Sequence, residues 1–285
     1  MIKLIASDLD GTIIDKTNSV CQNNLDAINS IHKKEIPFAI CTGKTFPIIK
    51  NSISMFNASF GIFGNGNQII DFRTGKELYR KLLTMDDIEL CYKVAKKYNM
   101  HVHVYTDTEV ITEELLYMDL RNFKLKETKY YENSLEFKVT DNVLEYIKNN
   151  DSSVFQFIIS SIDNNLHAAE TELKDLSDLT VCKISKSGSY RDNIIDKEYS
   201  YLNITPHGIN KKQALDILKE HLKVEDSEIM AIGDNLNDLE MVKSFGVGVA
   251  VANAYNEIKE VAKYTTTNDA ANGGFAEAVH KFIEF

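Results

Sequence analysis

Long apolar runs are missing from this sequence, and none approaches the roughly 18 consecutive apolar residues that a membrane-spanning helix needs. The apolar stretch that precedes Asp8 is too short for a signal peptide, and no small-residue cleavage site follows it. Internal repeats, low-complexity tracts and long linkers are missing as well. We therefore expect a cytoplasmic protein without a membrane partner.

Cysteine is scarce, and its positions follow no ligand spacing. The four cysteines are Cys21, Cys41, Cys91 and Cys182. No two of them form a C-x-x-C motif, which argues against a zinc or redox site. Buried, reduced thiols are the simpler expectation.

Positive charge is also in short supply. Lysine and arginine total 32 against 42 acidic residues, so the net charge is -10. This balance argues against nucleic acid or an anionic membrane as the main partner. A phosphate ligand would have to find local positive charge, which a metal ion, a lysine and oriented backbone N–H groups supply.

The 285 residues, of which 44% are hydrophobic, suffice for one large core or two smaller ones. In the first part of the chain, short apolar segments alternate with segments of helical periodicity. Strands are predicted at 2–7, 37–41, 60–63, 68–71 and 77–79, and helices at 23–33 and 47–55. The first three strands predict a parallel sheet with right-handed crossovers, and the last two predict a hairpin.

From about residue 83 to about residue 200 the pattern changes to a mixture of helices and alternating strands. Strands and helices then alternate again, beginning with a strand at 201–204. We therefore predict an α/β fold: a Rossmann-like, three-layer core with a parallel sheet (1–82 and 200–285) and an inserted α+β domain (83–199).

Asp8-Leu9-Asp10-Gly11-Thr12 directly follows the first predicted strand. Side chains alternate along an extended backbone, so Asp8 and Asp10 can point to one place. A cation would relieve their repulsion and keep one carboxylate ionised as a nucleophile. Gly11 permits the sharp turn that exposes them. A polar turn is the alternative.

Two further groups offer partners for a phosphoryl group. Thr42 and Gly43 follow the second predicted strand, where a hydroxyl and backbone N–H groups can hold a phosphoryl oxygen. Lys211 lies near the start of a predicted helix and offers a point charge. Taken singly, the first is also what an ordinary turn contains, and the second could be a surface lysine.

Gly233-Asp234-Asn-Leu-Asn237-Asp238 repeats the pattern of a strand that ends in glycine and acid. Oxygen ligands from two strand ends suit Mg²⁺. Helix-capping aspartates are the alternative explanation. All four groups fall at or beside the carboxyl ends of predicted strands, where open α/β sheets bind their ligands.

These motifs, in this order and spacing, closely resemble those of the haloacid dehalogenase superfamily, and specifically its Cof-like (class IIB) sugar-phosphatase branch. The resemblance covers essentially the whole chain. It includes Asn65-Gly66, the segment from Gly248 to Ala254, and Asn272-Gly-Gly-Phe. It implies a Mg²⁺-dependent phosphatase that acts on a small phosphorylated metabolite, with sugar phosphates as the leading class and nucleotide or cofactor phosphates as further options.

The resemblance also implies a role for each position. Asp8 would attack phosphorus and form an aspartyl-phosphate, while Asp10 would protonate the leaving alcohol and then deprotonate water. The phosphate-binding residues would be Leu9, Thr42, Gly43, Lys211 and Asn237. The Mg²⁺ ligands would be the Asp8 carboxylate, the Asp10 carbonyl and Asp234. Asp238 would orient these ligands without binding the ion itself.

The chain departs from the family at Lys44, where many relatives have arginine, and lysine lacks the bidentate fork of arginine. The inserted domain would act as a cap that excludes water and reads the leaving group. In that domain His101 and His103 share one face of a strand, and we expect solvated side chains rather than a metal site. A monomer or weak homodimer is expected.

Two alternatives remain open at this point. A phosphomutase of the same superfamily would return the phosphoryl group to its sugar instead of releasing it. A non-enzymatic switch module, similar to the receiver domains of bacterial signalling, would also carry an aspartyl-phosphate beside Mg²⁺. Such modules lack the D-x-D-G-T string and a large inserted domain. Asp10, the expected acid/base residue, discriminates between an enzyme and a switch module.

Overall fold

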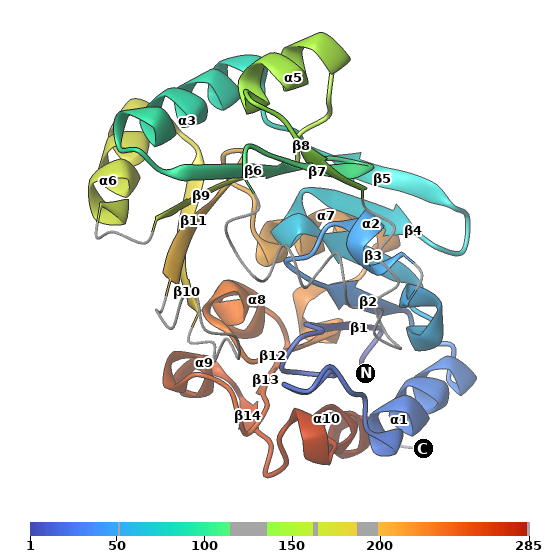
Figure 1. The fold of residues 1–285 in the computed structure, drawn as a ribbon. Coiled ribbons are helices and arrows are strands. Elements are labelled where there is room, and N and C mark those ends of the chain that lie inside the picture. The colour runs from blue at the N-terminus through green and yellow to red at the C-terminus, as the bar shows by residue number, and fades with distance from the viewer. Residues whose placement is uncertain (51, 115–135, 162–164, 187–198, 284–285) are drawn as a thin grey trace. The chain divides into compact units, whose positions relative to one another are not determined.

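The computed structural model describes residues 1–50, 52–114, 136–161, 165–186 and 199–283, which divide into two compact units (Figure 1). The core unit holds Met1–Arg80 and Ile209–Phe285, and the inserted unit holds the described residues between Lys81 and Gly208. The sequence predicts domain boundaries at 82/83 and 199/200. In the structure the boundaries lie at 80/81 and 208/209, so the second boundary differs more from its prediction than the first.

The core unit is built on one sheet. In spatial order its strands are β14 (Tyr264–Thr265), β13 (Val247–Ala250), β12 (Ile229–Gly233), β1 (Leu4–Ser7), β2 (Phe38–Cys41), β3 (Phe60–Phe63), β4 (Gln68–Asp71) and β5 (Lys76–Arg80). From β14 to β3 all neighbours are parallel. The strands β3, β4 and β5 then pair antiparallel, which confirms the predicted hairpin.

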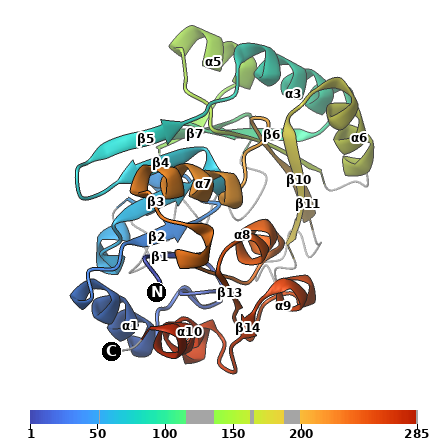
Figure 2. The same cartoon turned by 180° about the vertical axis from the view of Figure 1, so that it is seen from behind.

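Helices cover both faces of this sheet, as Figures 1 and 2 show. They are α1 (Gln22–Lys33), α2 (Phe46–Ile49), α7 (Lys211–Leu222), α8 (Leu239–Ser244), α9 (Asn256–Val261) and α10 (Gly274–Phe282). Adjacent residues of a strand point to opposite faces. Accordingly the Phe38 ring packs against Phe275 of α10, with centroids 5.7 Å apart, whereas Ala39 joins an apolar cluster with Leu215 of α7. The predicted three-layer α/β core is confirmed.

The helix that carries Lys211 starts at a well-defined cap. The Asn210 side chain accepts a hydrogen bond from the Gln213 N–H at 2.8 Å, which satisfies one of the unpaired donors of the first turn. Ala214, Leu215 and Leu218 bury one face of α7 against the sheet. Lys211 is thereby fixed in the first turn, next to the carboxyl ends of the strands.

One predicted helix is shorter than expected. Residues 47–55 form only the short α2 and a separate 3-10 turn, Ile53–Phe56, which ends at Asn57 in the left-handed conformation. Ile48, Ile49 and Ile53 are β-branched, which lowers helix propensity. All three are buried, so packing rather than helical periodicity decides the path of this segment.

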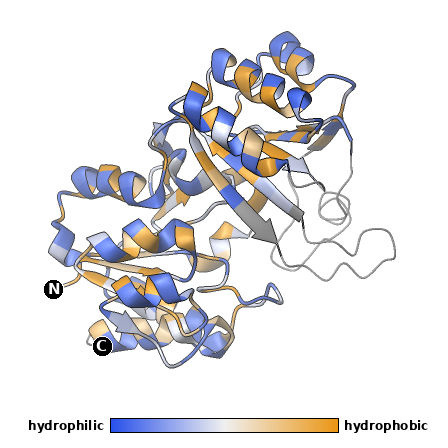
Figure 3. Cartoon of the chain, turned by 90° about the vertical axis from the view of Figure 1, so that its left-hand side faces the viewer, coloured by the Kyte–Doolittle hydropathy of each residue, from blue (hydrophilic) through white to orange (hydrophobic). Residues whose placement is uncertain are grey.

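The inserted unit has a sheet of its own, ordered β10 (Thr180–Lys186), β11 (Tyr199–Thr205), β9 (Gln156–Ser161), β6 (His101–Tyr105), β7 (Glu109–Thr112) and β8 (Glu136–Val139). Its helices are α3 (Met85–Lys97), α5 (Val143–Asn150) and α6 (Leu166–Leu176). Val102, Phe157 and Leu202 lie on the face that packs with these helices. Figure 3 shows that these helices carry both hydrophilic and hydrophobic residues, as expected for helices that bury only one face.

The strand predicted at 201–204 was placed in the wrong sheet. Residues 201–204 belong to β11, which pairs antiparallel with both β9 and β10. An apolar alternation predicts a strand, but the partner is set by contacts far away in the sequence. The chain therefore re-enters the core unit only at Ile209.

Two expectations about single side chains also need correction. His101 and His103 are buried rather than solvated. Burial lowers the pKa of His101 to about 4, and its ring nitrogen lies 3.2 Å from the Thr112 hydroxyl. All four cysteines are free, but Cys21 is half-buried and Cys182 is exposed.

In the part of the chain that the structure describes, we find no helix long and apolar enough to cross a membrane.

Candidate active site

Asp8 lies directly after β1, between the neighbouring strands β2 and β12. Its backbone N–H donates to the carbonyl oxygen of Ile232 at 2.9 Å, which continues the pairing of β1 with β12. Only 5% of the residue is exposed. The carboxylate is thus held at the carboxyl edge of the sheet by a rigid backbone.

Lys211 connects Asp8 to Asp238. Its Nζ atom lies 2.5 Å from Oδ1 of Asp8 and 2.6 Å from Oδ1 of Asp238, and none of its surface is exposed. Although burial lowers the pKa of Lys211, the attraction of the two carboxylates outweighs it and raises this pKa above its usual range. Lys211 is therefore a fixed positive charge inside an acidic protein.

Asp238 is fixed by hydrogen bonds at both oxygens. Oδ1 accepts from Lys211, and Oδ2 accepts from the backbone N–H groups of Asp234 and Asn235 at 3.1 and 3.0 Å. Gly233 makes this closeness possible, because a Cβ atom there would lie 2.5 Å from the Cβ of Asp238. Asp238 therefore organises the turn after β12.

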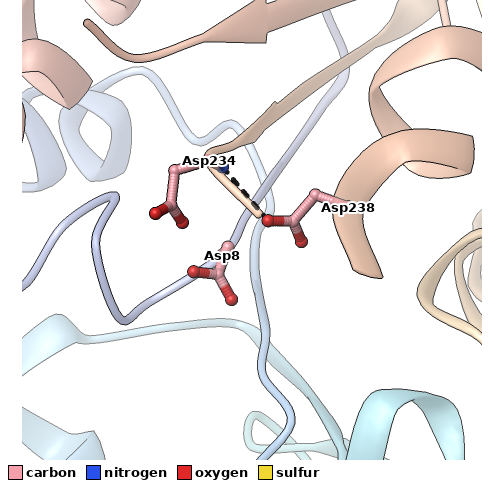
Figure 4. A group of neighbouring side chains, drawn as sticks. All are labelled: Asp8, Asp234 and Asp238. Carbon is pink, nitrogen blue, oxygen red and sulfur yellow. Dashed lines mark hydrogen bonds between the residues drawn. The ribbon is translucent and has the colours of Figure 1, made fainter. Parts of the chain in front are cut away.

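Asp8, Asp234 and Asp238 bring their carboxylates together, as Figure 4 shows. One oxygen from each lies within 4.8 Å of the others, and in the described part of the chain this is the one such group of three metal-ligating side chains. Burial raises the pKa of Asp8 well above its usual range, against the opposing effect of Lys211. Burial and the neighbouring Asp238 raise the pKa of Asp234 to about 7.

This electrostatic environment fits a hard cation. The donors are all carboxylate oxygens, which Mg²⁺ and Ca²⁺ prefer. Burial, and to a lesser extent the neighbouring acids, raises the pKa values of Asp8 and Asp234, and Lys211 opposes this only in part. A divalent cation beside Asp8 and Asp234 would favour their ionised forms and lower both pKa values.

The turn after Asp8 is shaped to lie against Asp234. Gly11 has φ +88°, and a Cβ atom there would lie 2.3 Å from Oδ2 of Asp234. The Thr12 hydroxyl donates to Oδ1 of the same carboxylate at 3.2 Å. The Leu9 carbonyl accepts from the N–H groups of Ile13 and Ile14, which closes the turn. In the D-x-D-G-T motif, Gly11 thus makes room for the Asp234 carboxylate and Thr12 donates a hydrogen bond to it.

Asp10 has a different environment from Asp8. Its side chain is 43% exposed and forms an ion pair with Lys44, whose side chain is 25% exposed. No local sequence pattern predicts this pair, because it joins turns that follow two different strands. The D-x-D motif therefore contains one buried carboxylate and one at the solvent edge.

Thr42 and Gly43 form the turn after β2. Thr42 is buried, and its hydroxyl oxygen accepts from the Lys44 N–H at 3.2 Å. Its N–H donates to the Ile62 carbonyl oxygen at 2.9 Å. Gly43 faces Asn65, whose Oδ1 lies 3.1 Å from the position of a Cβ atom at residue 43.

Asn237 is exposed and donates from Nδ2 to Oδ1 of Asn65 at 2.9 Å. Asn65 was not among the predicted site residues, although the Asn-Gly pair after a strand marks its position. Asn253 was also missed: it donates to the Gly11 carbonyl oxygen at 2.7 Å and accepts from the Ala270 N–H at 3.0 Å.

The structure therefore sorts the predicted residues into two sets. Asp8, Asp234, Asp238 and Lys211 form one buried charged cluster. Asp10 and Asn237 lie nearer the solvent, with Lys44 and Asn65 as their respective partners. The arrangement offers a buried carboxylate beside a fixed cation, and an accessible carboxylate two residues away.

Comparison of the sequence with known proteins identifies its family. The sequence profile of haloacid dehalogenase-like hydrolases matches residues 5–279. The chain is 29% identical over 283 residues to the 5-amino-6-(5-phospho-D-ribitylamino)uracil phosphatase of Bacillus subtilis (strain 168), a match that covers 99% of this chain and 96% of the relative. It is 25% identical over 283 residues to the phosphoglycolate phosphatase of Methanothermobacter thermautotrophicus, covering 99% of both chains.

Solved structures agree with this assignment. The crystal structure of a haloacid dehalogenase-like hydrolase from Bacteroides thetaiotaomicron superposes with a TM-score of 0.81 at 25% identity, over 99% of this chain and 100% of that one. The similarity spans the core unit and the inserted unit alike. The chain belongs to the haloacid dehalogenase-like hydrolases, as its motifs predicted.

Proposed function

We propose that this hydrolase is a Mg²⁺-dependent phosphatase that cleaves small phosphate monoesters, with Asp8 as its nucleophile. The observation that carries the proposal is the contact of Asp8 with the buried cation Lys211, at 2.5 Å, within a cluster of carboxylates. Lys211 supplies one positive charge at this position, and a cation bound by the carboxylates would supply the remaining local positive charge that an anionic substrate needs in a protein of net charge -10. The relatives above are themselves named as phosphatases.

Asp8, Asp234 and the backbone carbonyl of Asp10 would hold Mg²⁺, and Asp238 would orient Asp234 and Lys211. When bound, the ion supplies positive charge that keeps Asp8 ionised and offsets the charge of the phosphoryl group. The same charge explains how a carboxylate with a raised pKa can act as a nucleophile near neutral pH.

In the first step a carboxylate oxygen of Asp8 forms a bond to phosphorus while the bond from phosphorus to the leaving oxygen breaks. Asp10, which must enter this step in its protonated form rather than as the carboxylate paired with Lys44, gives its proton to that oxygen, so the alcohol leaves uncharged. The exposed position of Asp10 suits this role, because the leaving group must depart into solvent. The product is an aspartyl-phosphate on Asp8.

In the second step Asp10, now a carboxylate, takes a proton from a water molecule. The water oxygen bonds to phosphorus, the bond from phosphorus to Asp8 breaks, and inorganic phosphate is released. Phosphoryl transfer of this kind depends mainly on position and charge. Lys211, the Thr42 hydroxyl, the backbone N–H groups of Leu9 and Gly43, and Asn237 would hold the phosphoryl oxygens.

The substrate class is proposed from the relatives and from the inserted unit. The Bacillus relative is named for a phosphate on a ribitylamino group, and the Methanothermobacter relative for phosphoglycolate. Both are small phosphate monoesters, and we propose a sugar or sugar-like phosphate here. The inserted unit, predicted as residues 83–199, would act as the cap that reads the leaving group.

The test is a Mg²⁺-dependent hydrolysis assay. Wild-type protein should release phosphate from p-nitrophenyl phosphate with Mg²⁺ and not with EDTA, and a panel of phosphorylated metabolites should rank the substrates. Asp8→Asn should lose at least about 99% of the activity, because the nucleophile is absent. Asp216→Asn, a surface acid on α7, is the matched control and should retain full activity.

Two results would redirect the proposal. Conversion of a hexose phosphate into its isomer, without free sugar, would indicate a phosphomutase. A stable aspartyl-phosphate with no turnover on any ester would indicate a switch module. Appreciable activity in Asp8→Asn would exclude Asp8 as the nucleophile.

A further inference from the structure

Asn65 forms a left-handed turn directly after β3. Its φ is +60°, and its neighbours Gly64 and Gly66 also have positive φ, at +59° and +121°. Its backbone N–H donates to the Thr42 carbonyl oxygen at 3.0 Å. Asparagine tolerates this conformation better than most residues with a Cβ atom. The turn thus ties the end of β3 to the end of β2.

The side chain of Asn65 reaches two loops at once. Its Oδ1 accepts from Nδ2 of Asn237, in the turn after β12, at 2.9 Å. The same oxygen lies 3.1 Å from the position of a Cβ atom at Gly43, in the turn after β2, so any larger residue there would press against it. One amide therefore lies against two loops that come from different strands, and is hydrogen-bonded to one of them.

The turn itself does not require an amide side chain. Glycine adopts φ +60° without strain, and both neighbours of Asn65 are already glycine. Gly66 is restricted for another reason, since a Cβ atom there would lie 2.7 Å from the Asn210 carbonyl oxygen. Backbone geometry explains the two glycines, and it leaves the contacts of the Asn65 side chain to be explained.

We propose that Asn65 is a positioning residue of the phosphate site, which holds Asn237 and the Gly43 loop at the separation that a phosphoryl group needs. This inference rests on the proposed function, because Asn237 and the Gly43 N–H are phosphate contacts only there. Asn65 acts through them and touches no residue of the Asp8, Asp234 and Asp238 cluster by any hydrogen bond found among the described residues. Its effect should therefore fall on phosphate binding and leave the metal site intact.

Asn65→Gly tests this with little risk to folding, because it keeps the backbone conformation and deletes only the amide. The matched control is Asn57→Gly, since Asn57 also has positive φ but is exposed and precedes β3 at the opposite end of the strand. With p-nitrophenyl phosphate as substrate, Asn65→Gly should raise both KM and the inhibition constant of inorganic phosphate about tenfold, the effect of one lost hydrogen bond to a charged group. The Mg²⁺ concentration for half-maximal activity and the melting temperature should match those of Asn57→Gly.

A double-mutant cycle with Asn237→Ala separates positioning from general damage. If Asn65 acts through Asn237, the inhibition constant of phosphate in the double variant should equal that of the weaker-binding single variant. Multiplication of the two single effects would overturn the inference. So would equal phosphate inhibition constants in Asn65→Gly and Asn57→Gly. Absence of Mg²⁺-dependent hydrolysis in the wild type would instead reject the proposed function, a result that is read before any variant is compared.

Discussion

The ammonium group of Lys211 lies 2.5 Å from a carboxylate oxygen of Asp8, although 203 positions separate the two residues in the sequence. Asp8 follows a central strand, and Lys211 lies in the first turn of α7, after the inserted unit. Neither side chain is accessible to more than a trace of solvent. The pair thus joins, in one charged site, the segments of the core unit that precede and follow the inserted unit.

The stability of the fold should depend far more on Lys211 than on the adjacent Lys212. Lys211→Met leaves Asp8 and Asp238 buried without their cation, and loss of one member of a buried ion pair costs about 3–5 kcal/mol. We expect the free energy of unfolding in urea, measured without metal near pH 8, to fall by about 3 kcal/mol or more.

Lys212→Met is the matched control for that variant. Lys212 is adjacent on α7 and pairs with Asp216 at 2.6 Å, but both side chains are partly exposed. An exposed pair contributes about 0.5 kcal/mol or less. Similar losses in the two variants would show that Lys211 is not an essential counter-ion.

Asp10→Asn should trap the aspartyl-phosphate. p-Nitrophenolate leaves without a proton, so the first step can still proceed, whereas water loses its general base in the second. We expect steady-state turnover to fall about 100-fold or more, with intact-protein mass spectrometry showing one added phosphoryl group. The double variant with Asp8→Asn should carry no such group. An unmodified Asp10→Asn protein under turnover would contradict the two-step scheme.

Mg²⁺ should stabilise the protein more strongly as the pH rises. The pKa of Asp234 is raised to about 7 in the fold, from a usual value of 3.8. The metal-free fold is therefore favoured while Asp234 keeps its proton, and it loses up to about 4 kcal/mol as the pH rises from about 4 to about 7. A bound cation pairs with the ionised form and removes this loss.

Thermal melts with Mg²⁺ or EDTA check this expectation. The increase in melting temperature caused by Mg²⁺ should be small near pH 5 and large near pH 8. In Asp234→Asn the increase should shrink at both pH values, because a ligand and its titration are lost together. A Mg²⁺ effect that stays constant over this range would argue against Asp234 as a metal ligand.

Much of this site was predictable because its chemistry lies at strand ends. Ser7-Asp8 and Gly233-Asp234 each end an apolar segment, and in a parallel sheet such ends meet at one edge. Local sequence therefore sufficed to predict that Asp8 and Asp234 lie together at the ends of two strands. The parallel pairing of β1 with β12 agrees with the parallel sheet predicted for the core.

Contacts that depend on loop conformation were not predictable in this way. The pairing of Lys44 with Asp10 and of Asn65 with Asn237 joins turns from different strands. The error at 201–204 has a related cause, since the pairing of β11 with β9 and β10 is set far away in the sequence. The burial of His101 and His103 likewise depends on what covers a sheet face, which alternation along one strand does not reveal.

Gly11→Ala should disable the site through Asp234 rather than through backbone strain alone. Gly11 and Gly75 both have positive φ, at +88° and +70°, so alanine costs either position about 1 kcal/mol of backbone strain. At Gly75 no atom lies within 4 Å of the new Cβ, whereas at Gly11 it would lie 2.3 Å from Oδ2 of Asp234. Gly75→Ala should keep full activity with a slightly lower melting temperature. Gly11→Ala must displace the Asp234 carboxylate, so we expect activity to fall about 100-fold and the Mg²⁺ requirement to rise, because an ångström of misplacement at a catalytic site has effects of this size. If both variants lose activity equally, the turn itself and not the Asp234 contact explains the glycine of D-x-D-G-T.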